Sequence, residues 1–254
     1  MGKNTKVRFS MHKIKILLLA FMLMIPVSFS YKWASYRNIF VMKNIKIEGN
    51  AILEKRDYLE IIGNLNEKQI ADVDTKSLSK DLEAIAFVKA ARVSRHYPNE
   101  IKIDIVERKP IAIINNKKQF LIDNEAVILP DNNSLIETAL IPMLSGFNPA
   151  DDLYPEGSET FSVKVKEAVE ILEFIRFNYN EFFDEISELT INKDDEFEIV
   201  LSEQPTRVIL GKNDIHIKIK ILKKFGEALG QRQLTDYKLL DMRYSKQLVA
   251  REWI

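Results

Sequence analysis

The sequence of 254 residues contains no cysteine, only eight glycines and only three histidines. The absence of cysteine excludes disulfide bonds, thiol catalysis and cysteine metal sites, so the fold has to rely on packing. The histidines (His12, His96 and His216) show no His-x-x-x-His spacing, which disfavours a zinc site and leaves little for a serine–histidine–carboxylate triad. No glycine-rich phosphate loop is present. The composition leans against catalysis, and only a paired-carboxylate glycosidase site stays open.

Long uncharged apolar runs are also scarce, because residues 16–29 form the only one. A membrane span needs about 20 mostly apolar residues, and the run reaches that length when its flanks are added, giving a predicted anchor at 14–36. The residues ahead of its apolar centre include no acid, which predicts a cytoplasmic tail at 1–13 and export of the rest. The alternative is a secretory signal cleaved near Ser28-Phe29-Ser30. The basic residues at this end are Lys3, Lys6, Arg8, Lys13 and Lys15.

The net charge is zero, with 37 basic and 37 acidic residues. Without the basic N-terminal group the exported part is mildly acidic, which argues against nucleic acid as a partner. The remaining length of about 220 residues suffices for one large domain or two modest ones. Hydrophobic residues make up 46% of the chain and charged residues 29%, as in ordinary globular proteins.

The first exported module is predicted to run strand, helix, helix, strand, strand. Residues 43–50 alternate polar and apolar side chains and end in a Gly-Asn turn. Two short amphipathic helices follow, at 53–62 and around Leu78 to Ile85, the second capped by Asp74 or Thr75. Strands are predicted at 87–93 and 101–105.

This order resembles a POTRA domain. The stretch from Phe87 to Ala112, with Tyr97-Pro98-Asn99-Glu100 and Glu107-Arg108-Lys109-Pro110 in it, resembles more specifically the FtsQ/DivIB family of bitopic bacterial cell division proteins. The resemblance implies a POTRA domain at 41–110 and a second α+β domain at 111–254. The Glu107-Arg108 pair, taken alone, is typical of a locally paired structural feature and not of an active site.

The second module is predicted to be α+β, with an antiparallel sheet and helices on one face. A small meander is expected within 111–129, a strand at 141–146 and a surface loop at 147–160. Apolar spacing predicts a helix from Val165 to Ile175 and another from Ile215 to Leu229. Further strands are predicted at 186–191, 196–201, 206–210 and 237–244.

Near the C-terminus, Asp241-Met242-Arg243-Tyr244 followed by Trp253 resembles the signature of the same family. There the resemblance implies that FtsB and FtsL dock on the terminal sheet by pairing backbone with backbone, which an unpaired sheet edge permits. It implies no cofactor or metal. Tyr244 also fits a half-buried strand residue without a binding role. The residues predicted to contact the partner are Arg243 and Tyr244, followed by Lys246, Leu248 and Val249.

By this resemblance the chain is a non-catalytic scaffold of the divisome that links early cytoplasmic to late periplasmic division proteins. The resemblance also implies that other division proteins bind through the POTRA domain. It is expected as a single-pass protein of the inner membrane, with most of the chain in the periplasm at the septum. The alternatives are an anchored or secreted cell-wall hydrolase, and a POTRA-bearing chaperone or transport component.

Overall fold

The computed structural model of the protein describes residues 11–244 and 247–253, which form two compact units. The first unit comprises residues 11–50, Glu54–Leu82 and Ala91–Ile105, and the second comprises Ala51–Leu53, Glu83–Ala90 and residues 106–253. The units therefore alternate along the chain. The domain boundaries at 41–110 and 111–254 stay a prediction.

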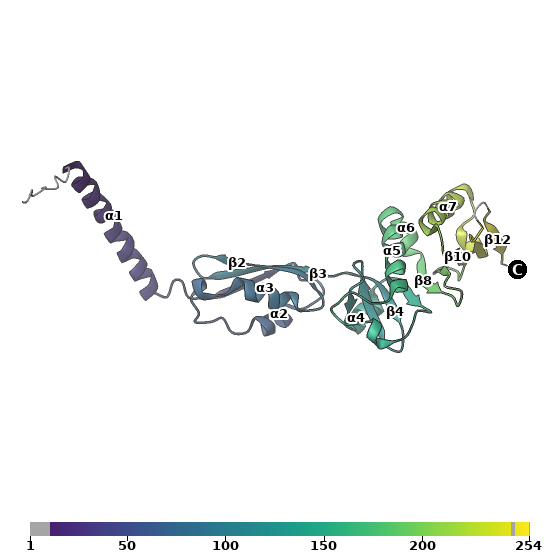
Figure 1. Cartoon of the computed structure of the whole chain (residues 1–254), viewed down its shortest axis with the longest axis horizontal. Coiled ribbons are helices and arrows are strands. Elements are labelled where there is room, and N and C mark those ends of the chain that lie inside the picture. The colour runs from purple at the N-terminus through teal and green to yellow at the C-terminus, as the bar shows by residue number, and fades with distance from the viewer. Residues whose placement is uncertain (1–10, 245–246, 254) are drawn as a thin grey trace, which may run out of the picture. The chain divides into compact units, whose positions relative to one another are not determined.

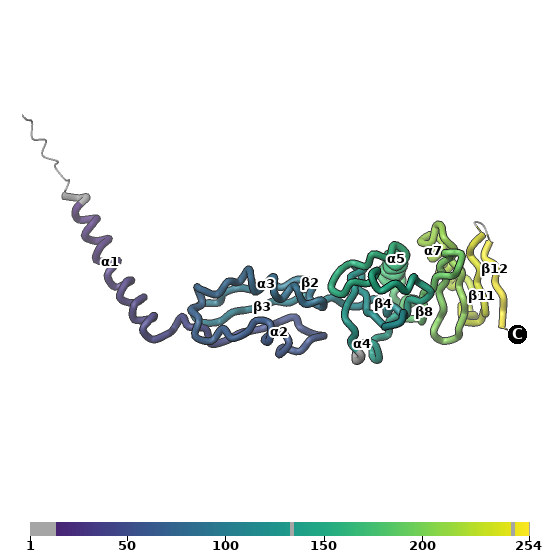
Figure 2. Tube along the Cα trace, turned by 60° about the horizontal axis from the view of Figure 1, so that its bottom comes forward, coloured from purple at the N-terminus to yellow at the C-terminus, as the bar shows by residue number. Residues whose placement is uncertain are grey.

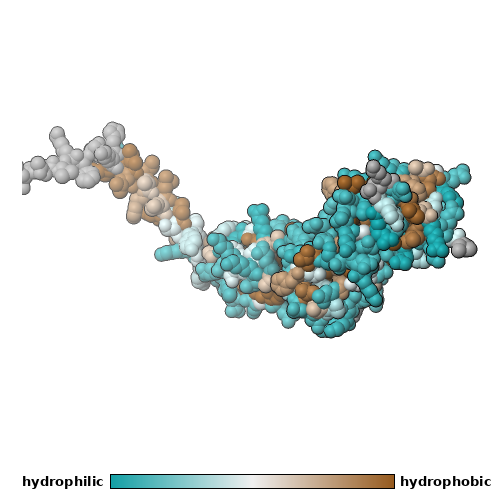
Figure 3. Space-filling model, turned by 45° about the vertical axis from the view of Figure 1, so that its right-hand side comes forward, coloured by the Kyte–Doolittle hydropathy of each residue, from teal (hydrophilic) through white to brown (hydrophobic). Residues whose placement is uncertain are grey.

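The first element is the helix α1 (Met11–Tyr36). Its segment Ile14–Tyr36 is, among the helices of the described residues, the only one long and apolar enough to cross a membrane. At about 1.5 Å per residue these 23 residues span roughly 35 Å, slightly more than a hydrocarbon core. None of them is buried, and Figure 3 shows apolar atoms over the middle of the helix. The helix is a candidate membrane anchor.

Most of a three-stranded sheet in the order β1-β3-β2 (Asn44–Glu48, Glu100–Glu107 and Val88–His96) belongs to the first unit, while the start of β2 and the end of β3 belong to the second. The edge strand β1 runs parallel to β3, with Ile45 opposite Ile101. Two helices, α2 (Lys55–Ile62) and α3 (Thr75–Glu83), lie along one side of the sheet, and a short 3-10 turn at Ile70–Asp72 separates them (Figure 1). The predicted order of strand, helix, helix, strand and strand is confirmed.

Local sequence explains these elements. Strand β3 alternates strictly, so that Ile101, Ile103 and Ile105 are buried while the residues between them are not. The Asp74 carboxylate accepts hydrogen bonds from the amides of Lys76 and Ser77, at 3.0 and 3.1 Å, and thereby caps α3 as predicted. The helices contribute Tyr58, Ile62, Leu78 and Leu82 to the core.

The second unit is built on a nine-stranded sheet in the order β12-β11-β10-β9-β8-β7-β4-β5-β6. Its strands are β4 (Pro110–Asn115), β5 (Gln119–Asp123), β6 (Ile128–Leu129), β7 (Met143–Ser145), β8 (Ile186–Ile191), β9 (Phe197–Leu201), β10 (Arg207–Gly211), β11 (Tyr237–Asp241) and β12 (Val249–Glu252). The helices are α4 (Asn133–Thr138), α5 (Val163–Asn178), α6 (Asn180–Asp184) and α7 (Ile215–Ala228). Strands β8, β9 and β10 pair antiparallel, as predicted.

The α+β class is confirmed, but the sheet is mixed and not antiparallel throughout. Strand β4 is parallel to β7, β7 to β8, and β10 to β11. A parallel pair needs a crossover, and the chain supplies helices α5 and α6 between β7 and β8 and helix α7 between β10 and β11. Figure 2 shows α5 and α7 in this unit, with β11 and β12 side by side beyond them.

Helices cover both faces of this sheet. The larger core packs buried residues of α5, α6 and α7 against one face, around Leu172, Phe182 and Leu222. On the other face, Leu135 and Ile136 of α4 pack with Ile52 and Leu53 against a smaller cluster from β4, β5 and β6. The expected placement of helices on one face therefore holds for α5, α6 and α7 and is wrong for α4.

The stretch predicted as a surface loop, 147–160, is partly buried. It contains a 3-10 turn at Asp151–Leu153, and both Tyr154 and Thr160 are buried. The Tyr154 hydroxyl donates a hydrogen bond to the carbonyl of Asn148 at 2.6 Å. The segment thus folds onto the large core, since the ring of Tyr154 stacks on Phe120 at 6.0 Å.

Glu107 and Arg108 both have structural roles, and each binds a different segment of the chain. The Glu107 carboxylate accepts hydrogen bonds from three successive amides, those of Ala51, Ile52 and Leu53, at 2.6, 2.6 and 3.0 Å. Arg108 pairs with the buried Asp123 at 2.6 Å. Together these contacts tie the end of β3 to two other segments of the second unit.

Candidate partner-binding site at the C-terminal sheet edge

Strand β12 is the outermost strand of the nine-stranded sheet. It pairs antiparallel with β11 on one side, with Leu240 opposite Ala250 and Asp241 opposite Val249. All four of its residues are exposed. A strand in this position presents backbone N–H and C=O groups along its outer side, so it offers a template for a further strand.

Side-chain contacts at the C-terminal end of β12 hold the strand in place. The Trp253 indole N–H donates a hydrogen bond to the carbonyl of Thr235 at 3.0 Å, and Lys238 lies over the Trp253 ring at 5.9 Å. Arg232 pairs with Glu252 at 2.9 Å. The strand is therefore fixed before any partner arrives, which lowers the entropic cost of adding another strand.

Arg243 is engaged within the chain. Its guanidinium donates to both carboxylate oxygens of Asp241, with a shortest distance of 2.6 Å, and lies 3.4 Å from Glu196. Asp241 is buried, yet the hydrogen bond from Arg243 lowers the pKa of its carboxyl against the opposing effect of burial. The carboxylate in turn raises the pKa of Arg243. The Arg243 side chain stays partly exposed, so it both orders the end of β11 and faces solvent.

Tyr244 borders an apolar groove beside this edge. Its side chain is 57% exposed, and it lines a cavity of about 380 Å³ together with Leu248 and the buried Met242. Ile217 and Ile221, one turn apart on α7, form the opposite wall and are both exposed. Exposed aliphatic and aromatic side chains around one groove are typical of a protein-binding surface.

The structure thus brings together most of the predicted contact residues. Tyr244 and Leu248 share the groove, Val249 begins the edge strand, and Arg243 lies two residues beyond the end of β11. Lys246 lies outside the described residues. That these residues contact a partner stays a prediction.

Sequence reasoning missed Ile217 and Ile221. The predicted apolar stripe of α7 was Ile215, Ile219, Leu222, Phe225 and Leu229, and of these Ile219 and Leu222 are fully buried. The signal that could have found the two isoleucines is their position off this stripe, because aliphatic residues on the polar side of a helix have no core to enter.

These features define a class of protein: a chain with one candidate membrane anchor, a POTRA-type sheet unit and a second unit with a long mixed sheet. Two family models match consecutive parts of the chain: "POTRA domain, FtsQ-type" matches residues 40–108 and "FtsQ/DivIB, C-terminal related" matches 109–251. The chain belongs to the FtsQ/DivIB family of cell division proteins.

Several relatives carry the name cell division protein FtsQ. The one from Geotalea daltonii is 21% identical over 87% of this chain and 79% of its own length. The one from Koribacter versatilis is 22% identical over 81% of this chain and 58% of its own length. A third, from Novosphingobium aromaticivorans, is 35% identical over only 35% of this chain and 28% of its own length.

Proposed function

We propose that the protein is a non-catalytic scaffold of the division complex, which recruits other division proteins to the septum. Its basic N-terminal tail lies in the cytoplasm, residues 14–36 cross the inner membrane, and the two units lie in the periplasm. The charge asymmetry around the anchor supports this orientation. The single observation that carries the scaffold role is the exposed edge strand β12 beside an apolar groove.

The proposed partners at this edge are proteins of the FtsB and FtsL type. An extended partner segment adds a strand to β12, with backbone hydrogen bonds supplying affinity. The alternate side chains of that segment supply specificity, because one set of them reaches the groove of Tyr244, Leu248, Ile217 and Ile221. Confinement of both proteins to one membrane raises their effective concentration, so that modest edge contacts suffice.

The residues have distinct roles in this proposal. Tyr244 is the aromatic anchor, since buried aromatic side chains dominate interface energetics. Leu248 and Val249 extend the apolar contact onto the edge strand. Arg243 offers its exposed side to a partner carboxylate, and Lys246 adds a second cation.

A binding titration tests the proposal. The full chain in detergent micelles is titrated with the periplasmic segments of the FtsB and FtsL counterparts from its own organism. We expect saturable binding that Tyr244→Ala weakens at least tenfold, because truncation of a central aromatic anchor typically costs about 2 kcal/mol or more. Phe161→Ala is the matched control, since Phe161 is a similarly exposed aromatic residue that lines a different cavity.

Each outcome bears on a different part of the proposal. Loss of binding in both variants with retained folding would indicate a nonspecific apolar effect and remove the groove from the interface. Full binding by Tyr244→Ala would keep the scaffold role and place the interface elsewhere. Absence of binding by the folded wild-type chain would remove these partners and return the hydrolase and chaperone alternatives.

A further inference from the structure

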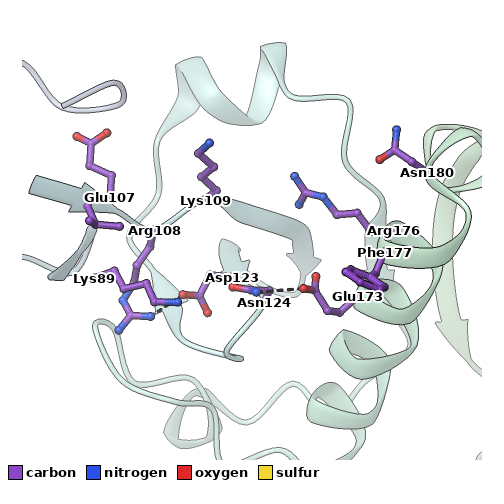
Figure 4. Close-up of a pocket in the computed structure, with 11 residues that line it drawn as sticks. Lys89, Glu107, Arg108, Lys109, Asp123, Asn124, Glu173, Arg176, Phe177 and Asn180 are labelled. Carbon is purple, nitrogen blue, oxygen red and sulfur yellow. Dashed lines mark hydrogen bonds and ion pairs between the residues drawn. The ribbon is translucent and has the colours of Figure 1, made fainter. Parts of the chain in front are cut away.

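The second unit contains a cavity of about 550 Å³, distinct from the C-terminal edge. It lies between the junction of β3 and β4, the turn after β5, and the last turns of α5 (Figure 4). This volume is within the range of natural ligand sites. The lining residues that matter are Arg108, Lys109, Asp123, Glu173, Arg176 and Phe177.

The floor of the cavity is a fixed and internally neutral network. Asp123, only 1% exposed, accepts hydrogen bonds from the amides of Glu125 and Val127 at 2.9 Å each and pairs with Arg108 at 2.6 Å. Arg108 and Lys89 both pair with Glu125, at 2.8 and 2.7 Å. These charges satisfy one another, so they shape the site without attracting a ligand.

Two cations on the walls have no such partner. Within the described part of the chain, neither Lys109 nor Arg176 forms an ion pair, and the Arg176 guanidinium lies over the ring of Phe183 at 5.5 Å. In Figure 4 the Arg176 guanidinium points from α5 toward the side of the cavity that holds Lys109. Two cationic donors that face one cavity favour a carboxylate.

The rim of the cavity is apolar. Phe177 is 85% exposed and Val106 is also exposed, although both line the cavity. The Glu173 carboxylate, which accepts a hydrogen bond from Asn124 at 3.2 Å, places one negative charge on the same wall. Glu107 also lines the cavity, but its carboxylate accepts hydrogen bonds from the amides of Ala51, Ile52 and Leu53. Outside the floor network the two cations are matched by two carboxylates, and a lining close to neutral suits a single carboxylate better than a polyphosphate.

We propose that this cavity binds an acidic peptide segment of another protein, in which a glutamate or aspartate lies next to an apolar residue. The carboxylate binds between Lys109 and Arg176, and the apolar side chain packs on Phe177 and Val106. The site is separate from β12 and its groove, so a negative result for one proposal leaves the other unaffected.

Fluorescence anisotropy tests this proposal on the full chain in detergent micelles. The probe is a fluorescein-labelled octapeptide that alternates glutamate with leucine. One matched peptide replaces each glutamate by glutamine, and a second replaces each leucine by serine. We expect saturable binding of the probe and at least about tenfold weaker binding of both matched peptides, because each lacks one of the two recognised features.

Variants localise the binding. Lys109→Gln and Phe177→Ala should each weaken it about tenfold, while Glu173→Gln should strengthen it a few-fold by removing a like charge. Lys118→Gln is the matched control, since Lys118 is exposed and lines none of this cavity. Tyr244→Ala should leave peptide binding unchanged. Thermal unfolding of each variant confirms that it is folded.

Three results would overturn the proposal. The first is that the folded wild-type chain does not bind the probe. The second is that the glutamine peptide binds equally well, or that Lys118→Gln weakens binding as much as Lys109→Gln. The third is that tripolyphosphate displaces the probe and binds the chain regardless of Phe177→Ala, which would make the cavity a general anion site.

Discussion

The substitution Glu107→Gln tests whether the Glu107 carboxylate holds the backbone of residues 51–53 in place. The Glu107 carboxylate accepts three backbone hydrogen bonds, two on Oε2 from Ala51 and Ile52 and one on Oε1 from Leu53. A glutamine keeps one acceptor oxygen for two of the amides and turns its NH₂ group against the third. Two bonds then lose their ionic character and one donor loses its acceptor.

The cost follows from typical hydrogen-bond energies. A bond to a charged group contributes about 1.5–3 kcal/mol and a neutral bond about 0.5–1.5, so each of the two weakened bonds loses about 1 kcal/mol. The unsatisfied donor adds about 1–3 kcal/mol, part of which water recovers because the site is only partly buried. The local cost is about 2–4 kcal/mol, which corresponds to roughly 30- to 900-fold faster exchange of these amide protons.

Hydrogen exchange measured by mass spectrometry gives the exchange rate of these amide protons. The full chain in detergent is used, and the rate is taken from a peptide that covers residues 51–53. Glu125→Gln is the matched control, because Glu125 pairs with Lys89 and Arg108 at a largely exposed position. Exposed ion pairs contribute at most about 1 kcal/mol, so the control should change the protection of these amides little. If Glu107→Gln changes the exchange rate of these amide protons by less than about threefold, the Glu107 carboxylate does not hold them as described.

Two further predictions concern the turn after β1 and the end of β11. Gly49 has a φ of +89°, and a Cβ there would overlap the carbonyl oxygen of Ile105. Gly49→Ala should therefore lower the free energy of unfolding, measured by urea titration, by about 2 kcal/mol or more. Gly63 has a φ of +67° but open space around it, so Gly63→Ala should lower the free energy of unfolding by only about 1 kcal/mol. The pKa of Asp241 is lowered by Arg243, so the ion pair stabilises the fold above the unfolded-state pKa near 4, and this contribution is lost as the pH falls through the lower folded-state pKa. Urea titrations between pH 3 and 6 should therefore show a difference in stability between the wild type and Asp241→Asn that narrows below about pH 4, and a constant difference would contradict the ion pair.

Much of the POTRA-type unit could be predicted because its signals are local. The alternation of β3 and the cap at Asp74 each lie within a few residues of sequence. The strands of the second unit other than β12 were also predicted, and so was the antiparallel pairing of β8, β9 and β10. The parallel pairs were not predicted, because a parallel pair depends on which crossover the chain takes. The packing of α4 on the second face could not be predicted from local sequence either, because its partners Ile52 and Leu53 come from a distant part of the chain.

The candidate site was predictable only in part. Its signature residues Arg243 and Tyr244 were found through a resemblance, whereas β12 reads Val-Ala-Arg-Glu and carries no alternating pattern, since all four residues are exposed. The ion pair of Arg243 with Asp241 joins two residues of one motif, so sequence could have suggested it. The groove wall from α7 depends on the crossover between β10 and β11, which no local pattern reveals.

The position of β12 in chain order has a consequence for assembly. On the proposed orientation the chain emerges from the translocation channel with its N-terminal side first, and β12 follows all eight other strands of its sheet. Until it emerges, the outer side of β11 is vacant, and any extended segment nearby competes for that place. The docking surface is therefore completed only after the other eight strands have been exported, so a partner that requires β12 distinguishes a fully translocated molecule from one still in transit.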